Sequence, residues 1–537
     1  MIQTFLRKDR TVLFFFFFLF AVYFGIFIYK TSFVVDGTRY FSLFDDAMVS
    51  MRYARNLAAG NGLVMNPGER VEGITNPLWT VYMAAVHLLP VTKEKISLVI
   101  QISAAILLAF NLLFVMKIAR LISKNVSAVT FSAVFLTAFY LPLINWSLQG
   151  MEVCVLTLLI SIIVWRMLIS LQSGQFTPSL YVLLGICMIL RIDMVVPFAG
   201  IWVFLIKAQP ENQTKNIIWG IVILMIFLVG QTVFRIVYYG EPLPNTYYLK
   251  MTGYPVLLRL SRGLIVLWQF IWSMNLFVFL VPVFVVIFAC NQYTGLLALV
   301  VGLQMLYSVY VGGDAWEEWG GSNRYIAVIM PQFFILLSWG LYRFSGIVSE
   351  FLSGREISGS KTFAFVKTYS FALLVILSFI HLNSNSNSLT LKGFFFFDLP
   401  PYVANNKTMV ERANLVKKIT TPEARIAVTW AGIIPYFSER YTVDMLGKTD
   451  KTIARLNMRL APENENKYTY FLPGHLKYDY EHSLIAKKPD IVLQFWDNIH
   501  ESDEIIAKNY VKIIVGDLWV YALQGSKNVR WNLFPKN

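Results

Sequence analysis

Residues 11–29 read TVLFFFFFLFAVYFGIFIY, an uninterrupted apolar run that is long enough to cross a membrane as one helix. A spanning helix needs about 20 apolar residues, whereas the apolar part of a signal peptide is about 7–15 residues long. No Ala-x-Ala cleavage site follows the run, so we expect it to remain as the first membrane span. Arg7, Lys8 and Arg10 precede it, and this basic flank predicts a cytoplasmic N-terminus.

Apolar runs of similar length recur up to residue 382 and predict a polytopic α-helical membrane protein with about 11–13 transmembrane helices. The further candidate spans are 96–116, 126–145, 151–171, 216–238, 264–289, 293–311, 325–343 and 364–382. Two runs are less regular, because 78–90 is short and bracketed by prolines and 179–207 is interrupted by Arg191 and Asp193. Such segments predict a pair of short helices or a broken helix that lines a cavity.

The composition indicates the same class of protein. Of the 537 residues, 56% are hydrophobic and 15% are charged, whereas soluble domains are about 45–50% apolar and about 25% charged. The formal net charge is +14, but the Lys and Arg residues flank the apolar runs. This placement indicates membrane topology and anionic lipid or phosphate partners, and no nucleic acid.

Basic loops predict which connections face the cytoplasm. These loops carry Lys117, Arg120 and Lys124, then Lys207 and Lys215, then Arg343, Arg355, Lys361 and Lys367. The outer side is then expected to hold residues 30–77, 146–150, 239–262, 312–324 and the tail after residue 383. For a bacterial chain this means the inner membrane, with the tail in the periplasm.

A membrane domain followed by a soluble domain is the predicted organisation. Residues 1–382 form the transmembrane domain with its first outer loop at 30–77, residues 383–392 form a polar linker, and residues 393–537 form a soluble α/β domain. Apolar patterns in the last domain predict buried strands at 425–429 and 490–494, another strand at 511–515 and a helix at 411–419.

Two adjacent carboxylates stand in the first outer loop, within the run from Phe44 to Leu57. Apolar residues recur there at helical spacing and predict an amphipathic helix lying in the membrane interface. Asp45 and Asp46 have two interpretations. They cap the helix N-terminus, or one is a general base while Arg52 and Arg55 hold a phosphate.

Other outer loops and interrupted spans add polar residues toward the same side of the membrane. Ionisable groups at membrane depth are costly and usually face a water-filled cavity or a partner. Loop hydrogen bonding is the alternative for Glu72 and Asn76, and mutual pairing is the alternative for Arg191 and Asp193. The candidates for binding substrate or phosphate are Arg52, Arg55, Glu72, Asn76, Glu152, Arg191, Asp193, Tyr239, Asn245, Lys250, Asp314 and Arg324.

Signatures of several other enzyme classes are missing from the sequence. It has no Walker loop, no His-Glu-x-x-His and no Gly-x-Ser-x-Gly motif. The five histidines and three cysteines show no metal-ligand spacing. Clustered carboxylates suit Mg²⁺ or Mn²⁺, so a divalent cation is the one metal cofactor that remains open.

Several motifs, in one order along most of the chain, resemble the membrane glycosyltransferases of the GT-C fold, and among them the cell-wall arabinofuranosyltransferases of mycobacteria and their relatives. The motifs are Asp45-Asp46 with Arg52 and Glu72-Gly-Ile-Thr-Asn-Pro77, Gly150-Met-Glu152, Arg191-Ile-Asp193, Tyr239-Gly-Glu-Pro-Leu-Pro-Asn245, Gly312-Gly-Asp314, Val443-Asp-Met-Leu-Gly-Lys-Thr-Asp450, Pro473-Gly-His475 and Lys488-Pro-Asp490. The chain departs from the family pattern at Met48, where an aromatic residue is common, and at Lys448, where leucine is common.

This resemblance implies an enzyme that takes a sugar, such as arabinofuranose, from a polyprenyl-phosphate carrier at the outer membrane face. It implies an acidic base in the first loop, which falls on Asp45 or Asp46. The acceptor would be a cell-envelope glycan, lipid or protein. A transporter or flippase of lipid-linked sugars is the alternative; internal repeats would favour it, and the sequence shows none. A non-catalytic scaffold would not explain the paired carboxylates.

Overall fold

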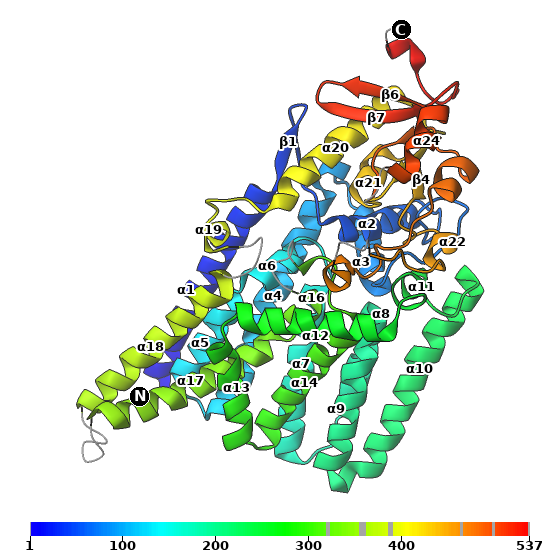
Figure 1. Ribbon diagram of the computed structural model, residues 1–537. Coiled ribbons are helices and arrows are strands. Elements are labelled where there is room, and N and C mark those ends of the chain that lie inside the picture. Colours follow the sequence, from blue (N-terminus) through cyan, green and yellow to red (C-terminus); the bar gives the residue numbers. More distant parts are fainter. Residues whose placement is uncertain are drawn as a thin grey trace.

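The computed structural model describes residues 2–317, 323–353, 361–384, 390–461, 466–496 and 500–534. Within these residues a bundle of long helices carries the C-terminal part of the chain at one end, where a sheet and shorter helices gather (Figure 1). The predicted fold class, a polytopic helical membrane protein with a C-terminal α/β domain, is confirmed. Arg355 and residues 385–389 of the predicted linker lie outside the described residues.

Seven helices in the described ranges are long and apolar enough to cross a membrane, or eight if the bent pair α5 and α6 is one span. These seven are α1 (Ile2–Thr31), α4 (Lys93–Ser123), α7 (Val153–Ser173), α10 (Gln213–Tyr239), α12 (Val256–Ser273), α14 (Gln292–Val311) and α18 (Lys361–Ser384). A further long helix is α17 (Met330–Ser353). The bent pair is α5 (Ser127–Ala138) and α6 (Leu141–Leu148). The total of about 11–13 spans stays a prediction.

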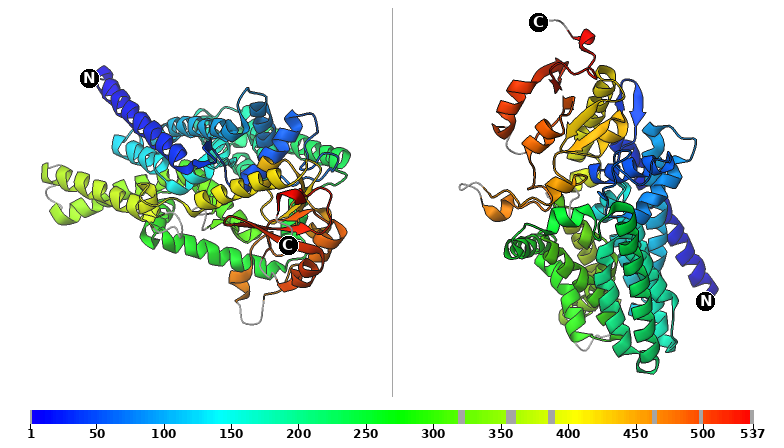
Figure 2. Two further views of the ribbon diagram at one scale, coloured as in Figure 1. Left: turned by 90° about the horizontal axis from the view of Figure 1, so that it is seen from above. Right: turned by 90° about the vertical axis from the view of Figure 1, so that its right-hand side faces the viewer.

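The single span predicted at 264–289 is wrong. The chain forms two helices there, α12 and α13 (Leu276–Phe288), and Asn275 between them has a left-handed φ of 79°. In Figure 1 α12 runs across the bundle, crosswise to α9 and α14, and Figure 2 shows the same bundle from two further sides. Its buried face carries Arg259 and Arg262 and its exposed face carries Trp268, a distribution typical of a helix at a membrane surface.

The interrupted run at 179–207 forms the expected pair of short helices, α8 (Ser179–Leu190) and α9 (Val195–Ala208). They are joined by Arg191 in extended conformation and by the short 3₁₀ turn η1 (Ile192–Met194). The irregular run at 78–90 becomes α3 (Pro77–His87). With 11 residues α3 is about 17 Å long, too short to span the hydrocarbon core.

The helix predicted in the first outer loop is α2 (Asp45–Ala58), but it does not lie against lipid. Most of its residues are buried, because it packs between α3 below it and α21 (Ile433–Ser438) of the C-terminal domain. Its polar face is satisfied by protein atoms. Asn56 Nδ2, for example, donates to the carbonyls of Val64 and Met65 at 2.8 Å each. The prediction that this helix lies in the membrane interface is therefore wrong.

The C-terminal domain is built on a five-stranded mixed sheet with strand order β4-β3-β5-β7-β6. The strands are β3 (Arg425–Val428), β4 (Tyr441–Asp444), β5 (Ile491–Val492), β6 (Tyr510–Val515) and β7 (Leu518–Leu523). β3 runs parallel to β4 and β5, and the other pairs are antiparallel. The three predicted strands are confirmed, although β6 is an edge strand that exposes Ile514.

Shorter elements complete the fold and connect its two parts. They are β1 (Phe33–Val35), β2 (Thr38–Tyr40), η2 (Pro210–Asn212), α11 (Asn245–Met251), α16 (Arg324–Ala327), α19 (Leu391–Phe394), α20 (Pro401–Ile419), α22 (Lys451–Ala454), α23 (Lys467–Tyr470), the π-helix η4 (Glu481–Ala486), α24 (His500–Asn509) and η5 (Trp531–Leu533). α20 contains the helix predicted at 411–419 and packs on α21.

Candidate active site

Two cavities meet where the bundle contacts the C-terminal domain. The first, called here the large cavity, has a volume of about 320 Å³ and lies between α2, α9, α10, α11, α14, α16 and the turn that follows α8. The second, called the aromatic pocket, holds about 20 Å³ and is lined by Phe44, Trp316, Trp430, His475 and Trp496 beside polar groups. Among the described residues, Asp46 and Lys448 line both cavities.

Asp45 faces the C-terminal domain and anchors it. Its Oδ1 accepts hydrogen bonds from the backbone N–H groups of Gly432 at 3.2 Å and Ile433 at 2.9 Å. Burial raises the pKa of Asp45 to about 6, and the two hydrogen bonds only partly offset this. Asp45 therefore caps α21, a helix more than 380 residues further along the chain, and not its own helix.

Asp46 faces the junction of the two cavities. Lys448 Nζ pairs with its Oδ1, and Arg324 Nη1 lies 3.0 Å from its Oδ2. Burial by itself would raise the pKa of Asp46. The positive charges of Lys448, Arg324 and Lys250 outweigh burial and hold that pKa well below its usual range. Asp46 is thus an ionised carboxylate surrounded by cations.

Arg324 joins a carboxylate on α2 to one in the loop after α14. Its Nε lies 2.8 Å from Asp314 Oδ2, while Nη1 contacts Asp46. Lys250, from α11, lines the same cavity. Burial and the charge of Arg324 lower the pKa of Lys250 to about 8. The large cavity therefore carries more positive than negative charge where Lys250, Arg324 and Lys448 converge near Asp46.

A hydrogen-bonded chain of polar side chains forms another wall of the large cavity. Arg191 Nη1 lies 2.6 Å from Glu152 Oε1, and its Nε lies 2.9 Å from Asp193 Oδ1. Asn76 Nδ2 donates to Glu152 Oε2 at 2.7 Å, and Ser50 Oγ donates to Asn76 Oδ1 at 2.8 Å. The predicted Arg191–Asp193 pair exists, and both residues also line the cavity.

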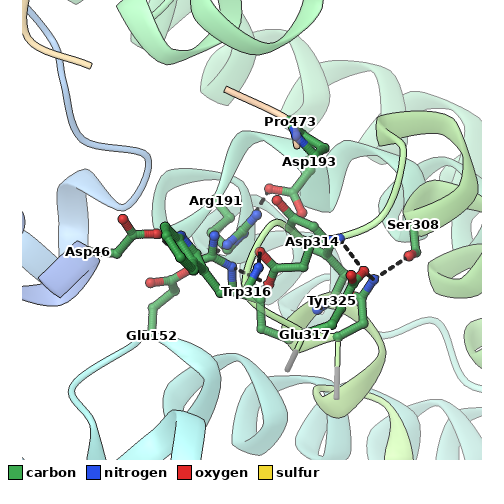
Figure 3. Close-up of polar contacts among 12 residues, drawn as sticks. Asp46, Glu152, Arg191, Asp193, Ser308, Asp314, Trp316, Glu317, Tyr325 and Pro473 are labelled. Carbon is green, nitrogen blue, oxygen red and sulfur yellow. Dashed lines mark hydrogen bonds and ion pairs between the residues drawn. The ribbon is translucent and has the colours of Figure 1, made fainter. Parts of the chain in front are cut away.

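Figure 3 shows this part of the site, with Asp46, Glu152, Arg191, Asp193 and Asp314 gathered in one region. They come from α2, from the residue before α7, from the turn between α8 and α9, and from the loop after α14. We expected these carboxylates and cations to lie on one side of the membrane, and the structure brings them together around the large cavity.

Three other candidate residues lie behind the cavity wall. Glu72 Oε2 accepts a hydrogen bond from Arg235 Nε at 2.8 Å. Tyr239 Oη donates to the Leu63 carbonyl at 2.9 Å. Asn245 Nδ2 donates to the carbonyls of Gly447 and Lys448 at 2.9 and 3.0 Å. Glu72, Tyr239 and Asn245 do not line the large cavity. Glu72 and Asn245 bind residues that do line it, namely Arg235 and Lys448.

The structure does not bring Arg52 and Arg55 into the site. Arg52 donates to the carbonyls of Met65 and Arg440 at 3.3 and 3.4 Å. Arg55 Nη2 lies 3.0 Å from Glu439 Oε2, beyond the far end of α21. Both guanidinium groups join α2 to neighbouring segments, because their positions on the helix turn them away from Asp46. Arg52 and Arg55 therefore do not line either cavity, and the prediction that they bind phosphate there is wrong.

The aromatic pocket was not predicted from the sequence. Trp316 and Trp430 lie with ring centroids 5.1 Å apart, and the His475 ring meets Trp316 edge-on at 4.8 Å. Burial and the charge of Lys448 lower the pKa of His475 to about 3, so its ring is neutral. One available signal was the motif Pro473-Gly-His475, and another was Lys448 within Val443–Asp450.

Asp314 belongs to a loop that is held by a second ion pair. Arg262, on the buried face of α12, lies 3.2 Å from Glu317 Oε2 and also donates to the Asp314 carbonyl. Glu317 Oε1 accepts the backbone N–H of Asp314 at 2.6 Å. Burial raises the pKa of Glu317 to about 7, partly offset by Arg262. The crosswise helix α12 therefore fixes the position of Asp314.

The described residues do not favour a metal site. They contain no group of three or more His, Cys, Asp or Glu side chains placed to hold a metal ion. Both carboxylate oxygens of Asp46 are already paired with cations. The divalent cation that the sequence left open therefore stays unconfirmed.

The fold of this chain is that of the GT-C membrane glycosyltransferases, since solved structures of that class align with nearly all of it. ArnT of Cupriavidus metallidurans, solved bound to undecaprenyl phosphate, has a TM-score of 0.54 and 12% identity over 97% of this chain and 99% of its own. The oligosaccharyltransferase AglB of Archaeoglobus fulgidus, in complex with an inhibitory peptide and a dolichol-phosphate, has a TM-score of 0.56 and 11% identity over 98% and 75%.

Curated sequence relatives are terminal β-(1→2)-arabinofuranosyltransferases. That of Mycobacterium tuberculosis is 26% identical over 217 residues, which are 38% of this chain and 34% of the relative. That of Corynebacterium glutamicum is 25% identical over 227 residues, covering 38% and 32%. The matches thus span about a third of the curated relatives. Residues 402–532 match a family described as a domain of unknown function (DUF8728).

Proposed function

We propose that this protein is an integral-membrane glycosyltransferase that moves a sugar from a polyprenyl-phosphate donor to a cell-envelope acceptor. The observation that carries the proposal is the position of Asp46, an ionised carboxylate between a large cationic cavity and a small aromatic pocket. A group-transfer enzyme brings two substrates to one catalytic group, and this arrangement supports such a function.

The large cavity suits the phosphate and sugar of the donor. Lys250 and Arg324 present cations in a partly dry site, where fixed charge contributes most to stabilising a leaving group. The solved relatives hold undecaprenyl phosphate and dolichol-phosphate, which supports a lipid phosphate here. The bond energy needed for transfer is stored in the donor, so a nucleotide site is not required.

The aromatic pocket suits the acceptor. The pocket's volume of about 20 Å³ has room for a group about the size of one water molecule. It would therefore admit the attacking hydroxyl between Trp316, Trp430 and Trp496, while the rest of the acceptor stays outside the pocket. An acceptor hydroxyl placed there would point toward Asp46. The acceptor itself, whether glycan, lipid or protein, stays open because several classes of hydroxyl fit such a pocket.

The reaction we propose is a single displacement with inversion. Asp46 takes the proton of the acceptor hydroxyl as that oxygen attacks the anomeric carbon of the donor sugar. The bond between the anomeric carbon and the phosphate oxygen breaks, and its electron pair leaves with the polyprenyl phosphate. Asp45 supports this step indirectly, because its bonds to Gly432 and Ile433 fix the start of α2.

Arabinofuranose is the sugar we propose, supported by the two curated relatives. The motifs shared with arabinofuranosyltransferases support the same sugar. We further propose that the site and the C-terminal domain face the periplasm of a bacterial inner membrane, in agreement with the basic loops at the opposite ends of the helices.

The test is sugar transfer by the purified protein in lipid nanodiscs, supplied with radiolabelled polyprenyl-phosphate sugars, arabinofuranose first. Asp46→Asn should lower kcat by about 10²–10⁴-fold while donor binding is kept. Asp36→Asn, an exposed carboxylate in the same outer loop, is the matched control and should leave kcat unchanged.

Three other outcomes would contradict the enzyme assignment or the role of Asp46. If the wild-type protein consumes none of the donors, the enzyme assignment fails. If lipid-linked sugar instead crosses the bilayer of a proteoliposome without being consumed, the protein is a flippase. If Asp46→Asn keeps its turnover, Asp46 is not the base.

A further inference from the structure

Lys448 is brought to the site by the C-terminal domain. It lies in the loop between β4 and α22, and this loop is held in shape by Asp444. Asp444 Oδ1 accepts the Leu446 N–H at 3.1 Å and Oδ2 accepts the Thr449 N–H at 2.8 Å. Gly447 allows the turn with a left-handed φ of 75°. The lysine is therefore presented by a rigid loop.

The bundle holds the same loop from the other side. Asn245 Nδ2 donates to the carbonyls of Gly447 and Lys448. Gly73 packs so closely that a Cβ placed on it would lie 2.9 Å from the Lys448 carbonyl oxygen. The backbone of Lys448 is thus fixed by both parts of the molecule, while its side chain, about 20% exposed, lies between the two cavities.

The proposed reaction moves charge past this side chain. Before transfer, Asp46 carries a negative charge and the donor phosphodiester carries another. After transfer, Asp46 is protonated and neutral, and the polyprenyl phosphate is a monoester with a charge of about −1.5 to −2 at pH 7. Negative charge leaves the carboxylate and appears on the phosphate, so a cation near both has its best partner first on one and then on the other.

We propose that Lys448 moves its ion pair from Asp46 to the leaving polyprenyl phosphate as the sugar is transferred. This inference rests on the proposed glycosyl transfer. It assigns a role to the domain of unknown function, which supplies a cation that is bound more strongly in the transition state than in the ground state. It also gives a reason why this chain has a lysine in the Val443–Asp450 motif.

Lys448 is better suited to this change of partner than Arg324. Arg324 is held between Asp46 and Asp314, so its guanidinium is fixed by two carboxylates. Lys448 makes a single side-chain ion pair with Asp46 among the described residues. Its ammonium group is a compact charge on a flexible stem. Burial by itself would lower the pKa of Lys448, but the negative charges of Asp46, Asp45 and Asp444 outweigh burial and raise that pKa above the usual value. Lys448 is therefore charged before transfer, and the charge that appears on the leaving phosphate replaces that of Asp46 beside it.

The experiment compares Lys448→Met and Lys448→Arg with the wild type. Three quantities are measured in nanodiscs: kcat, the Kd of the donor, and the Kd of the product polyprenyl phosphate. For Lys448→Met we expect kcat to fall about 10–100-fold and product binding to weaken at least about tenfold more than donor binding. Lys448→Arg keeps the charge and should retain most of kcat.

A chemical rescue separates the amine from the fold. Lys448→Cys in a Cys290→Ser background, where Cys154 and Cys187 are buried, is alkylated with 2-bromoethylammonium to rebuild an amine at the same position. Recovered kcat and product binding support the proposal. Equal weakening of donor and product, or no recovery on alkylation, overturns it. The proposed function fails separately, if the wild-type protein transfers no sugar.

Discussion

The Asp45 carboxylate accepts the backbone N–H of Ile433 at 2.9 Å, so the first turn of the first outer helix closes the N-terminal end of α21 in the C-terminal domain. The next residue, Asp46, pairs with Lys448 and Arg324 instead. Adjacent carboxylates on one helix therefore have different partners: Asp45 joins the two parts of the molecule, and Asp46 holds the cations at the junction of the two cavities.

Asp45→Asn should change how stability depends on pH. The pKa of Asp45 is raised to about 6 in the folded protein, above the unfolded value of about 3.9. The protonated form is thus favoured by folding, and its stabilisation of roughly 3 kcal/mol, present below pH 4, is lost as the pH rises through 6. Asparagine still accepts both N–H groups and does not ionise. Thermal unfolding between pH 4 and 7 should show a smaller decline in Tm for the variant; an unchanged decline would contradict this assignment.

Gly432→Ala should weaken the contact between the two parts of the molecule. A Cβ on Gly432 would lie 2.0 Å from the Asp45 carbonyl oxygen and 2.7 Å from its Oδ1, so α2 and α21 must separate. We expect a loss of about 1–3 kcal/mol, seen as a lower Tm. Gly302→Ala, where nothing lies within 4 Å of the added carbon, is the control and should not lower Tm.

Lys250→Met should weaken donor binding and remove part of its pH dependence. The pKa of Lys250 is lowered to about 8, so in the wild type the amine loses its charge as the pH rises above 8. Donor KM should rise over that range in the wild type. In the variant KM should be higher throughout and flatter between pH 7 and 9. A wild-type KM that is constant across this range would show that Lys250 does not hold the phosphate.

Arg191→Met should be strongly destabilising, since it leaves Glu152 and Asp193 buried without their cation. Removing one partner of a buried ion pair costs about 3–5 kcal/mol. The further change Glu152→Gln should recover part of this loss, because the glutamine amide needs no counter-charge. Denaturation of the single and double variants in detergent measures the recovery. Full additivity of the two losses would mean that the residues are not coupled.

Patterns within short segments predicted much of this fold. Apolar runs located most long helices, and Arg191 and Asp193 correctly marked the interruption between α8 and α9. The break at Asn275 was missed because apolar residues continue on both sides of it, and hydropathy alone does not report a change of direction. Amphipathicity was the available signal, since Arg259 and Arg262 lie on the buried face of α12.

The sequence predicted only those parts of the candidate site that depend on which side of the membrane a segment faces. Asp46 and Asp314 were expected on one side of the membrane, and they meet through Arg324. Lys448 lies 402 residues from Asp46 in the chain, and no periodicity or spacing rule links residues across two domains. Arg52 was misassigned for the same reason. Helical spacing shows that it lies on the same face of the helix as Asp45, but it cannot show that its guanidinium contacts the carbonyl of Arg440 in the other domain.

The short length of α8 has a consequence for the charged turn that follows it. Its 12 residues rise only about 18 Å, against about 30 Å of hydrocarbon. The polar turn at Arg191 consequently ends below the level of the lipid headgroups. The largely exposed helix α10 packs against both α8 and α9. The charged turn at Arg191 is therefore screened from the hydrocarbon by protein, at a depth where lipid could not hydrate it.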